Sequence, residues 1–218
     1  MRLFLNGHIQ FSSIDEARYH EALVHGAASA VVGPPSSALI LGGGDGLVAR
    51  ELLKYTSLEQ IELVDIDPAV TRLAQQRAVL RELNGNSLAS DKINIVHQDA
   101  MVYLQETDHF FDLIVIDLPD PNTEALSKLY STAFYTLILR RLSLGGVFVT
   151  QASSPFFAPE AYWSIVETIK ASGLESKHPQ SLSVLPYHVN VPSFGEWGFV
   201  MAGRHDIASQ SLNLSVPT

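Results

Sequence analysis

The chain has 218 residues, of which 46% are hydrophobic and 17% are charged, enough for one α/β domain with a buried core and a small appendage. It contains no cysteine, which excludes disulfides and thiolate metal sites and is typical of a reducing compartment, so we expect a cytoplasmic protein. A net charge of −9 without a basic run argues against nucleic acid as a partner and favours a small cation. No apolar run reaches the ~18 residues that span a bilayer, so we expect no membrane contact from this chain.

Residues 1–32 predict a β-hairpin followed by a helix. Asn6-Gly7 is a strong two-residue turn signal, and it separates apolar stretches at 3–5 and 8–11. A helix is expected from about residue 12 to residue 24. Because a two-stranded hairpin is marginally stable alone, it must lean on the rest of the domain or on strands that this chain lacks.

Residues 33–204 predict an α/β domain. Apolar strand patterns alternate with helical patterns, which indicates parallel strands joined by right-handed crossovers with helices on both faces of the sheet. The last two strands are expected to pair antiparallel at the edge, and residues 205–218 are expected to form a flexible tail. The predicted strands are 38–41, 61–64, 93–97, 112–116, 146–150, 182–191 and 197–202, and the helices are 47–55, 68–80, 100–105, 128–142 and 159–172.

A glycine-rich loop follows the first strand of this domain. Residues 38–41 are apolar and lead directly into Gly42-Gly43-Gly44-Asp45-Gly46. Glycines such as Gly42 and Gly44 permit a sharp turn and a close approach of the backbone to a ligand. Asp65 ends the next strand 20 positions after Asp45, the spacing at which a carboxylate meets the ribose hydroxyls of a nucleotide. The pattern predicts a ligand that contains a nucleoside.

Asp45 makes this loop unusual. A loop that binds a pyrophosphate presents backbone N–H groups, and a carboxylate there would repel the phosphates and attract a cation. The alternative is that Asp45 only caps the helix that starts near Leu47. Both roles are compatible, because one oxygen can cap while the other faces a ligand.

The other predicted strands also end in acidic or amide side chains. In open α/β sheets, ligands bind outside the carboxyl ends of the strands, so these side chains are expected to gather around one mouth. Such a rim suits amines, hydroxyls and an adenine rather than phosphates. Helix capping is an equal alternative for Asp99, and turn formation is the alternative for Asp117 and Asp120. The residues are Asp65, Asp99, Asp117, Asp120 and Gln151.

Two carboxylates three positions apart at a buried strand end repel each other, so Asp117 and Asp120 would need a raised pKa or a bound cation. The eight histidines show no metal-ligand spacing, and we predict no metal. The absence of a Gly-x-Ser-x-Gly elbow argues against a serine hydrolase.

Several of these motifs occur in the order typical of one family. The chain contains Leu-Asn-Gly-His-Ile-Gln, Asp-Glu-Ala-Arg-Tyr-His-Glu-Ala-Leu, Gly-Gly-Gly-Asp-Gly, Val-Asp-Ile-Asp, Gln-Asp-Ala and Asp-Leu-Pro-Asp-Pro. It therefore resembles the spermidine synthases, the polyamine aminopropyltransferases, over residues 3–202. The late Val-Pro-Ser-Phe-Gly-Glu-Trp-Gly-Phe resembles bacterial members whose synthase domain follows a bundle of membrane helices.

The resemblance implies a Rossmann-like sheet of the class I methyltransferase type, with residues 1–32 as the remnant of a β domain. It implies no prosthetic group, decarboxylated S-adenosylmethionine as co-substrate, a polyamine as the second substrate, and a homodimer. Asp117 would accept the proton of the attacking amine. The amines would be held by Tyr19, His20, Asp45, Asp120 and Tyr187, and the nucleoside by Gln10, Asp65, Asp99 and Ala100.

The sequence departs from this family at three points. Leu118-Pro119 replaces the polar pair usual between the two aspartates, Thr123-Glu124 replaces the usual Gly-Pro, and most of the β domain is absent. Two other functions therefore stay open: an S-adenosylmethionine-dependent methyltransferase on the same fold, and a non-catalytic polyamine or nucleoside sensor. Methyltransferases of this fold commonly carry an acid two positions before the first glycine, where this chain has Ile40.

Overall fold

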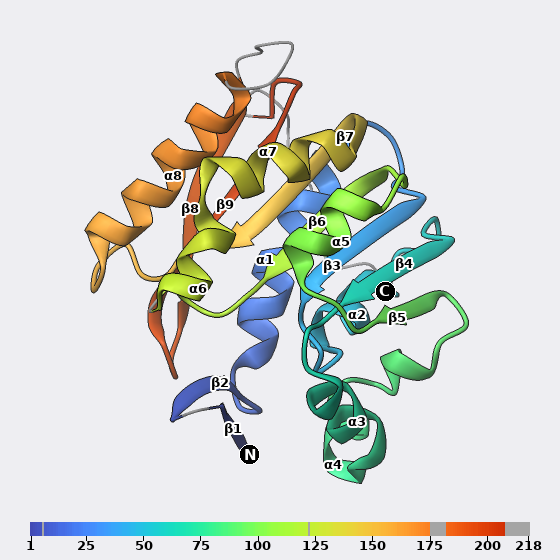
Figure 1. The fold of residues 1–218 in the computed structure, drawn as a ribbon. Coiled ribbons are helices and arrows are strands. Elements are labelled where there is room, and N and C mark those ends of the chain that lie inside the picture. Colours follow the sequence, from blue (N-terminus) through green and yellow to red (C-terminus); the bar gives the residue numbers. More distant parts are fainter. Residues whose placement is uncertain (6, 122, 175–181, 208–218) are drawn as a thin grey trace.

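A computed structural model describes residues 1–5, 7–121, 123–174 and 182–207. Seven strands form one sheet in the order β5-β4-β3-β6-β7-β9-β8 (Figure 1). Strands β3 to β7 pair parallel, while β9 pairs antiparallel with both β7 and β8. The predicted fold class, a mostly parallel sheet with an antiparallel edge pair, is confirmed. The strands are β3 (Ser37–Gly42), β4 (Gln60–Val64), β5 (Ile93–Val96), β6 (Phe111–Asp117), β7 (Leu142–Gln151), β8 (Ser183–Val191) and β9 (Gly195–Gly203).

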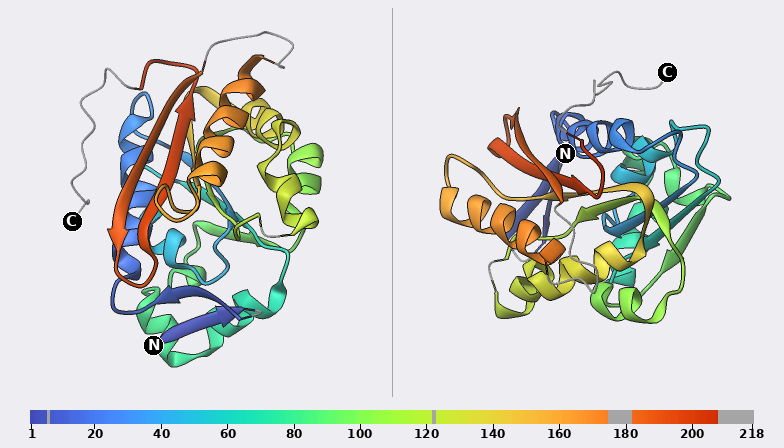
Figure 2. Two further views of the ribbon diagram at one scale, coloured as in Figure 1. Left: turned by 90° about the vertical axis from the view of Figure 1, so that its left-hand side faces the viewer. Right: turned by 90° about the horizontal axis from the view of Figure 1, so that it is seen from above.

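The central strands are buried on both faces. In β3, Ala38 and Ile40 belong to one apolar cluster, whereas Leu39 and Leu41 belong to another on the opposite face. This two-sided burial explains the continuous apolar run in the sequence. Helices cover both faces (Figure 2). One face carries α1 (Glu16–Ala30), α2 (Leu47–Leu52) and α3 (Pro68–Gln76), and the other carries α5 (Ala100–Glu106), α7 (Thr132–Arg141) and α8 (Pro159–Leu174).

The chain reverses its direction of travel across the sheet between β3 and β6. From β3 the crossovers run outward to β4 and β5, and from β6 they run the other way to β7. Gly42 at the end of β3 lies opposite Asp117 at the end of β6. Ligands of open α/β sheets bind at such a switch point. The fold therefore places the glycine-rich loop and Asp117 together at the expected binding position.

The N-terminal hairpin consists of β1 (Arg2–Leu5) and β2 (His8–Ser12), which pair antiparallel as predicted. It lies at the same end of the sheet as the glycine-rich loop (Figure 1). The side chain of Phe11 is 1% exposed and packs with Leu47 of α2 and Leu80 of α4 (Ala78–Leu83). This small apolar cluster supplies the support that the hairpin needs.

Four helices differ clearly from their predicted bounds, and one of them, α2, ends at Leu52 rather than at residue 55. Helix α1 continues to Ala30, because its apolar side chains pack into the main core beneath β7 and β8. The helix predicted at 68–80 is divided between α3 and α4 by Arg77, whose backbone is extended. The segment predicted at 128–142 is divided into a 3-10 turn η2 (Lys128–Tyr130) and α7, and a short helix that was not predicted, α6 (Glu124–Ser127), precedes it. A second 3-10 turn, η1 (Ser87–Ala89), follows α4.

The packing of α1 bears on the predicted division after residue 32. Leu23, Val24 and Ala27 of α1 belong to the same apolar cluster as β3 and β7. The boundary stays a prediction, and this packing favours grouping α1 with the sheet. Most of the tail predicted at 205–218 lies outside the described residues. In the described part of the chain, no helix is long and apolar enough to cross a membrane.

Candidate active site

The glycine-rich loop packs too closely against its neighbours to carry side chains. Gly42 has a φ of +83°, and a Cβ there would collide with the backbone carbonyl of Asp117. A Cβ on Gly44 would collide with the carboxylate of Asp65, which accepts a hydrogen bond of 3.0 Å from the Gly44 N–H. The glycines thus bring the ends of three neighbouring strands together, as the sequence predicts.

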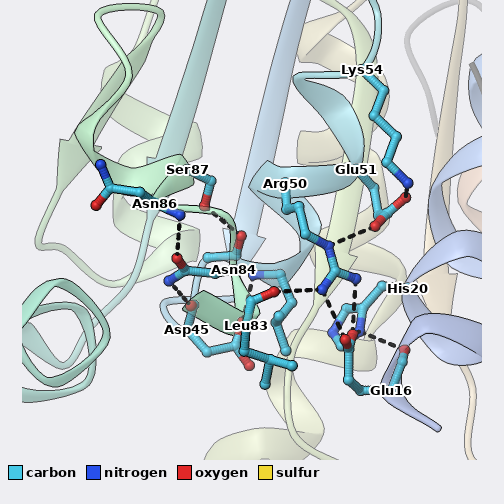
Figure 3. Close-up of polar contacts among 12 residues, drawn as sticks. Glu16, His20, Asp45, Arg50, Glu51, Lys54, Leu83, Asn84, Asn86 and Ser87 are labelled. Atoms are coloured by element: carbon cyan, nitrogen blue, oxygen red, sulfur yellow. Dashed lines mark hydrogen bonds and ion pairs between the residues drawn. The ribbon is translucent and has the colours of Figure 1, made fainter. Parts of the chain in front are cut away.

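Asp45 makes the contact expected of a residue at the start of a helix, and its role toward a ligand stays a prediction. Its Oδ1 accepts a hydrogen bond of 3.0 Å from the Leu47 N–H at the start of α2, and its backbone carbonyl accepts one of 2.8 Å from Asn84 (Figure 3). Burial raises the pKa of Asp45 to about 6; His20 opposes this rise and Asp117 adds to it. A carboxylate held in this way gains from a cationic ligand that stabilises its charged form.

Asp117 is hydrogen-bonded to the hydroxyl of Tyr19. The Tyr19 hydroxyl donates to Asp117 Oδ1 at 2.6 Å, across 98 positions of sequence. Burial and the negative charge of Asp117 raise the pKa of Tyr19 well above its usual value, so the hydroxyl stays a donor at neutral pH. Helix α1 therefore does lie over the strand ends, which brings two predicted site residues into direct contact.

His20 follows Tyr19 on α1, and its side chain is buried. Its Nδ1 lies 2.8 Å from the backbone carbonyl of Glu16 and 2.9 Å from Glu16 Oε2. Burial alone would lower the pKa of His20, but the bond with Glu16 and the charges of Asp45 and Asp117 outweigh it, and the pKa is raised. His20 thus belongs to the same electrostatic cluster as the two aspartates.

The turn after Asp117 is fixed by Gln151, which the sequence placed at a strand end of the same mouth, and by Tyr130, which the sequence analysis did not single out. The Gln151 amide donates 3.1 Å to Asp120 Oδ1 and 2.8 Å to the carbonyl of Leu118. The Tyr130 hydroxyl donates 3.0 Å to the carbonyl of Pro119. These contacts hold the turn in place although Leu118-Pro119 replaces the polar pair that is usual in the family. The amide at the end of β7 was the available signal for Gln151.

The carboxylates expected to hold a nucleoside keep free acceptor capacity. Asp65 accepts one backbone N–H on each oxygen, from Gly44 at 3.0 Å and from Asp67 at 2.8 Å, which leaves a lone pair on each oxygen. Burial raises the pKa of Asp65, although these two hydrogen bonds oppose the rise. Asp99 caps α5 through Oδ1 alone, bonding the N–H groups of Met101 and Val102. The buried Ala100 follows it as the first residue of α5.

The last two predicted residues lie in different surroundings. Gln10 lies on β2, beside the Phe11 that anchors the hairpin. Tyr187 donates its hydroxyl to the carbonyl of Ala22 on α1 at 2.8 Å, so its polar group holds β8 against that helix. The phenylalanine rings beside Tyr19 are those of Phe199 and Phe194, with 5.3 and 6.1 Å between ring centroids.

A buried ionic network lies behind His20, and the predicted site omits it. Arg50 of α2 donates to both carboxylate oxygens of Glu16, at 2.8 and 3.0 Å, and to Glu51 at 2.8 Å (Figure 3). Glu51 is also bonded to His25 at 2.9 Å and to Lys54 at 2.6 Å. Sequence offered little signal, because the Glu16–Arg50 contact joins two helices 34 positions apart. Among the described residues, no group of His, Asp and Glu is arranged to hold a metal ion.

Comparisons with known proteins show the family of this chain. The spermine/spermidine synthase domain model matches residues 16–210. A polyamine aminopropyltransferase of Oceanobacillus iheyensis is 47% identical over the whole chain, and one of Leptospira interrogans is 48% identical over 95% of it. The chain spans about two fifths of the length of these relatives, 41% and 40%.

Two solved structures show the same fold. A spermidine synthase in complex with the transition-state analogue AdoDATO superposes with a TM-score of 0.84 and 24% identity, covering 97% of this chain and 73% of that one. Spermidine synthase from Thermotoga maritima gives a TM-score of 0.81 and 23% identity, covering 99% and 72%. The sequence matches then fix the family: this chain belongs to the spermine/spermidine synthase domain family.

Proposed function

We propose that this chain is the catalytic domain of a polyamine aminopropyltransferase. It would transfer the aminopropyl group of decarboxylated S-adenosylmethionine to an amine such as putrescine and release 5′-methylthioadenosine. The observation that carries this proposal is the Asp117–Tyr19 pair, which lies beside Asp45 at the switch point of the sheet. Relatives 47–48% identical to the chain are named for this activity.

The nucleoside of the donor would bind along the ends of β3, β4 and β5. The remaining lone pairs of Asp65 suit the two ribose hydroxyls, which are hydrogen-bond donors. The Oδ2 of Asp99 suits the adenine amino group, with Ala100 beside it, because the capping bonds use Oδ1. Gln10 would contact the nucleoside from β2. Each of these roles is a proposal that rests on the family resemblance and on these contacts.

Asp45 would select the donor by charge. The arm of S-adenosylmethionine carries a carboxylate, whereas the arm of the decarboxylated donor ends in an ammonium. Asp45 repels the former and attracts the latter, and one partly shielded charge pair contributes up to a few kcal/mol. Arg50, which reaches this region from α2, directs its donors to Glu16, Glu51 and Leu83 and so does not cancel that charge.

Asp117 would act as the proton acceptor. An alkyl ammonium has a pKa near that of lysine, about 10.4, so the acceptor amine arrives protonated and inert. Asp117 takes one proton, and the nitrogen lone pair then forms the new N–C bond to the propyl carbon. The C–S bond breaks, and its electron pair returns to sulfur, which turns the sulfonium into a neutral thioether. The Tyr19 hydroxyl orients Asp117 for this step.

Asp120, His20 and Tyr19 would hold the distant amines of the acceptor, and for Tyr187 we retain the role of a residue in the acceptor channel as a prediction. Phe194, whose ring lies beside that of Tyr19, is an additional candidate for the channel wall. The cytoplasmic location and the homodimer also stay predictions.

Calorimetry with the two sulfonium donors tests this proposal. We expect the decarboxylated donor to bind at least about tenfold more tightly than S-adenosylmethionine, and Asp45→Asn to abolish the preference. Asp67→Asn is the matched control, because the exposed Asp67 side chain caps α3 and the substitution keeps the backbone N–H that bonds Asp65. Tighter binding of S-adenosylmethionine would contradict the proposal and favour a methyltransferase.

A turnover assay with putrescine completes the test. Formation of methylthioadenosine together with spermidine supports transfer, and loss of both products in Asp117→Asn supports the role of that carboxylate. Binding of both ligands without product would instead favour a non-catalytic sensor.

A further inference from the structure

The hydrogen bonds of His20 fix which ring nitrogen carries a proton. Its Nδ1 lies 2.8 Å from a backbone carbonyl and 2.9 Å from a carboxylate oxygen, both of Glu16. A carbonyl oxygen can only accept, so Nδ1 must be the donor. Both bonds that this ring makes with described residues involve Nδ1. The neutral ring is therefore the Nδ1–H tautomer, and Nε2 is the atom that gains or loses a proton.

Glu16 is itself held in one position. Arg50 donates to both of its carboxylate oxygens, at 2.8 and 3.0 Å, in a bidentate pair that fixes orientation as well as distance (Figure 3). Arg50 is anchored in turn by Glu51 and by the carbonyl of Leu83. Because the carboxylate of Glu16 is buried and paired, it stays charged, and its pKa is lowered: burial opposes this, but the bonds from His20 and Arg50 outweigh it.

The groups around His20 are mostly acidic. Glu16 lies one turn before it on α1, and the Tyr19 ring meets it edge-on with centroids 4.9 Å apart. Asp45 and Asp117 act on it from the loop after β3 and from the end of β6. Arg50, from α2, is the facing cation, and it acts through Glu16. In the absence of ligand, a proton on Nε2 would balance part of this negative charge.

We propose that Glu16 is a positioning residue which, held by Arg50, keeps His20 as an exchangeable counter-ion of the acidic mouth: Nε2 carries a proton when the mouth is empty and releases it to solvent when a cationic amine binds. The inference deepens the proposed function, because it concerns how that same site accepts a polyamine. The bound ammonium replaces the His20 imidazolium as the positive charge beside Asp45 and Asp117. If His20 kept its proton, repulsion between the two cations would weaken binding of the amine.

Nuclear magnetic resonance titration of the His20 ring gives a readout that does not depend on turnover. Nitrogen-15 spectra should show the neutral ring as the Nδ1–H tautomer, with the His20→Asn variant used to assign its signals among the eight histidines. Saturating spermidine should lower the His20 pKa by about one unit or more, because the carboxylates of Asp45 and Asp117, which raise this pKa, then also interact with the ligand.

Glu16→Gln tests the positioning role with little change of shape. We expect the His20 pKa to fall by about one unit in the ligand-free variant. Glu51→Gln is the matched control: it removes another buried carboxylate paired with Arg50, but one that contacts His25 rather than His20. It should leave the His20 titration within a few tenths of a unit.

The amine KM adds a functional readout. In the wild type the amine KM should rise about tenfold for each unit by which the pH falls below the His20 pKa. In Glu16→Gln this rise should begin about one pH unit lower. The kcat of this variant at pH 8 should be reduced less than tenfold. The inference is overturned if the neutral ring is the Nε2–H tautomer, if spermidine leaves the His20 titration unchanged, or if Glu16→Gln titrates like the wild type. Absence of turnover in the wild type would contradict the proposed function instead, while these titrations would still report on the ring.

Discussion

At the scale of single residues, the site contains charges that the fold alone does not favour. Burial raises the pKa of Asp45 to about 6, which means that the ionised carboxylate is less stable in the folded protein than in the unfolded chain. The loop nevertheless holds this carboxylate in place through the Leu47 N–H. Such a destabilising carboxylate is consistent with the proposed role of Asp45 in ligand binding.

Replacing Asp45 by Asn should therefore stabilise the ligand-free protein. The stabilising effect of a raised carboxyl pKa is complete below the unfolded value of 3.8 and is lost as the pH rises through about 6. The wild type loses this contribution, whereas Asp45→Asn cannot titrate. The difference should grow between pH 4 and pH 6 and reach up to roughly 3 kcal/mol above pH 7. Urea unfolding across this range measures it, and a variant less stable than the wild type at pH 7.5 would contradict the expectation.

Sequence reasoning found the residues that end strands and missed those that connect helices. The acids after β3, β4 and β6 could be located because each follows a buried apolar run, and parallel strands bring their carboxyl ends to one edge. Glu16 and Arg50 gave no such signal. A glutamate in a first helical turn and an arginine on a helix are ordinarily solvated, and only the packing of α1 on α2 pairs them.

At the scale of elements, the glycine-rich loop is fitted to the ends of β4 and β6. Gly44 approaches Asp65 so closely that its N–H bonds that carboxylate directly. The loop and Asp65, the residue proposed to bind the ribose, therefore depend on each other for their positions. A change in the loop should weaken binding of the donor more than binding of the acceptor.

Gly44→Ala should displace Asp65. The new Cβ would overlap the carboxylate, so either the side chain rotates away or the loop shifts, and the hydrogen bond is lost. We expect the donor KM to rise at least about tenfold, with a much smaller change in the KM for the amine. Steady-state kinetics with each substrate varied in turn measures the split. Gly85→Ala, which strains a backbone φ of +60° but meets only the Arg50 side chain at 3.7 Å, is the control for a loss of stability without a clash at Asp65. An equal rise in both KM values would contradict the expectation.

The predicted strands agree with the structure to within a few residues, because buried parallel strands have an unambiguous pattern. Helix ends were less predictable. The interruption at Arg77 has no glycine or proline to announce it, and the extension of α1 to Ala30 depends on tertiary packing of its alanines beneath β7 and β8.

At the scale of the whole molecule, α1 is a part of the core rather than an attachment. It packs against β6, β7, β8 and β9 as well as α2. It also supplies Tyr19 and His20 to the site. Stability and activity therefore depend on the same helix, and they should be lost together when it is removed.

Removal of residues 1–32 should abolish folding. The deletion exposes the apolar surface that Leu23, Val24 and Ala27 cover, and each large side chain lost from a core costs about 2–5 kcal/mol against a total stability of about 5–15 kcal/mol. Removal of residues 1–12 alone is the control, because it deletes the hairpin and keeps α1; that protein should fold with lower stability. Circular dichroism and thermal melting distinguish the two. A cooperatively folded protein without residues 1–32 would place the domain boundary where the sequence suggested.

The bond between Tyr187 and Ala22 has a consequence for the order in which the molecule is assembled. It joins residues 165 positions apart, and a further bond, from the Ser193 N–H to Asp15 Oδ2 at 2.6 Å, spans 178. A growing polypeptide leaves the ribosome from its N-terminus, so α1 emerges long before the strands that will cover it have been translated. The apolar side chains of α1 therefore stay exposed until nearly the whole domain has been synthesised. Nascent chains that stop short of β8 should therefore bind chaperones, and the candidate active site is complete only once the hairpin of β8 and β9 has been translated.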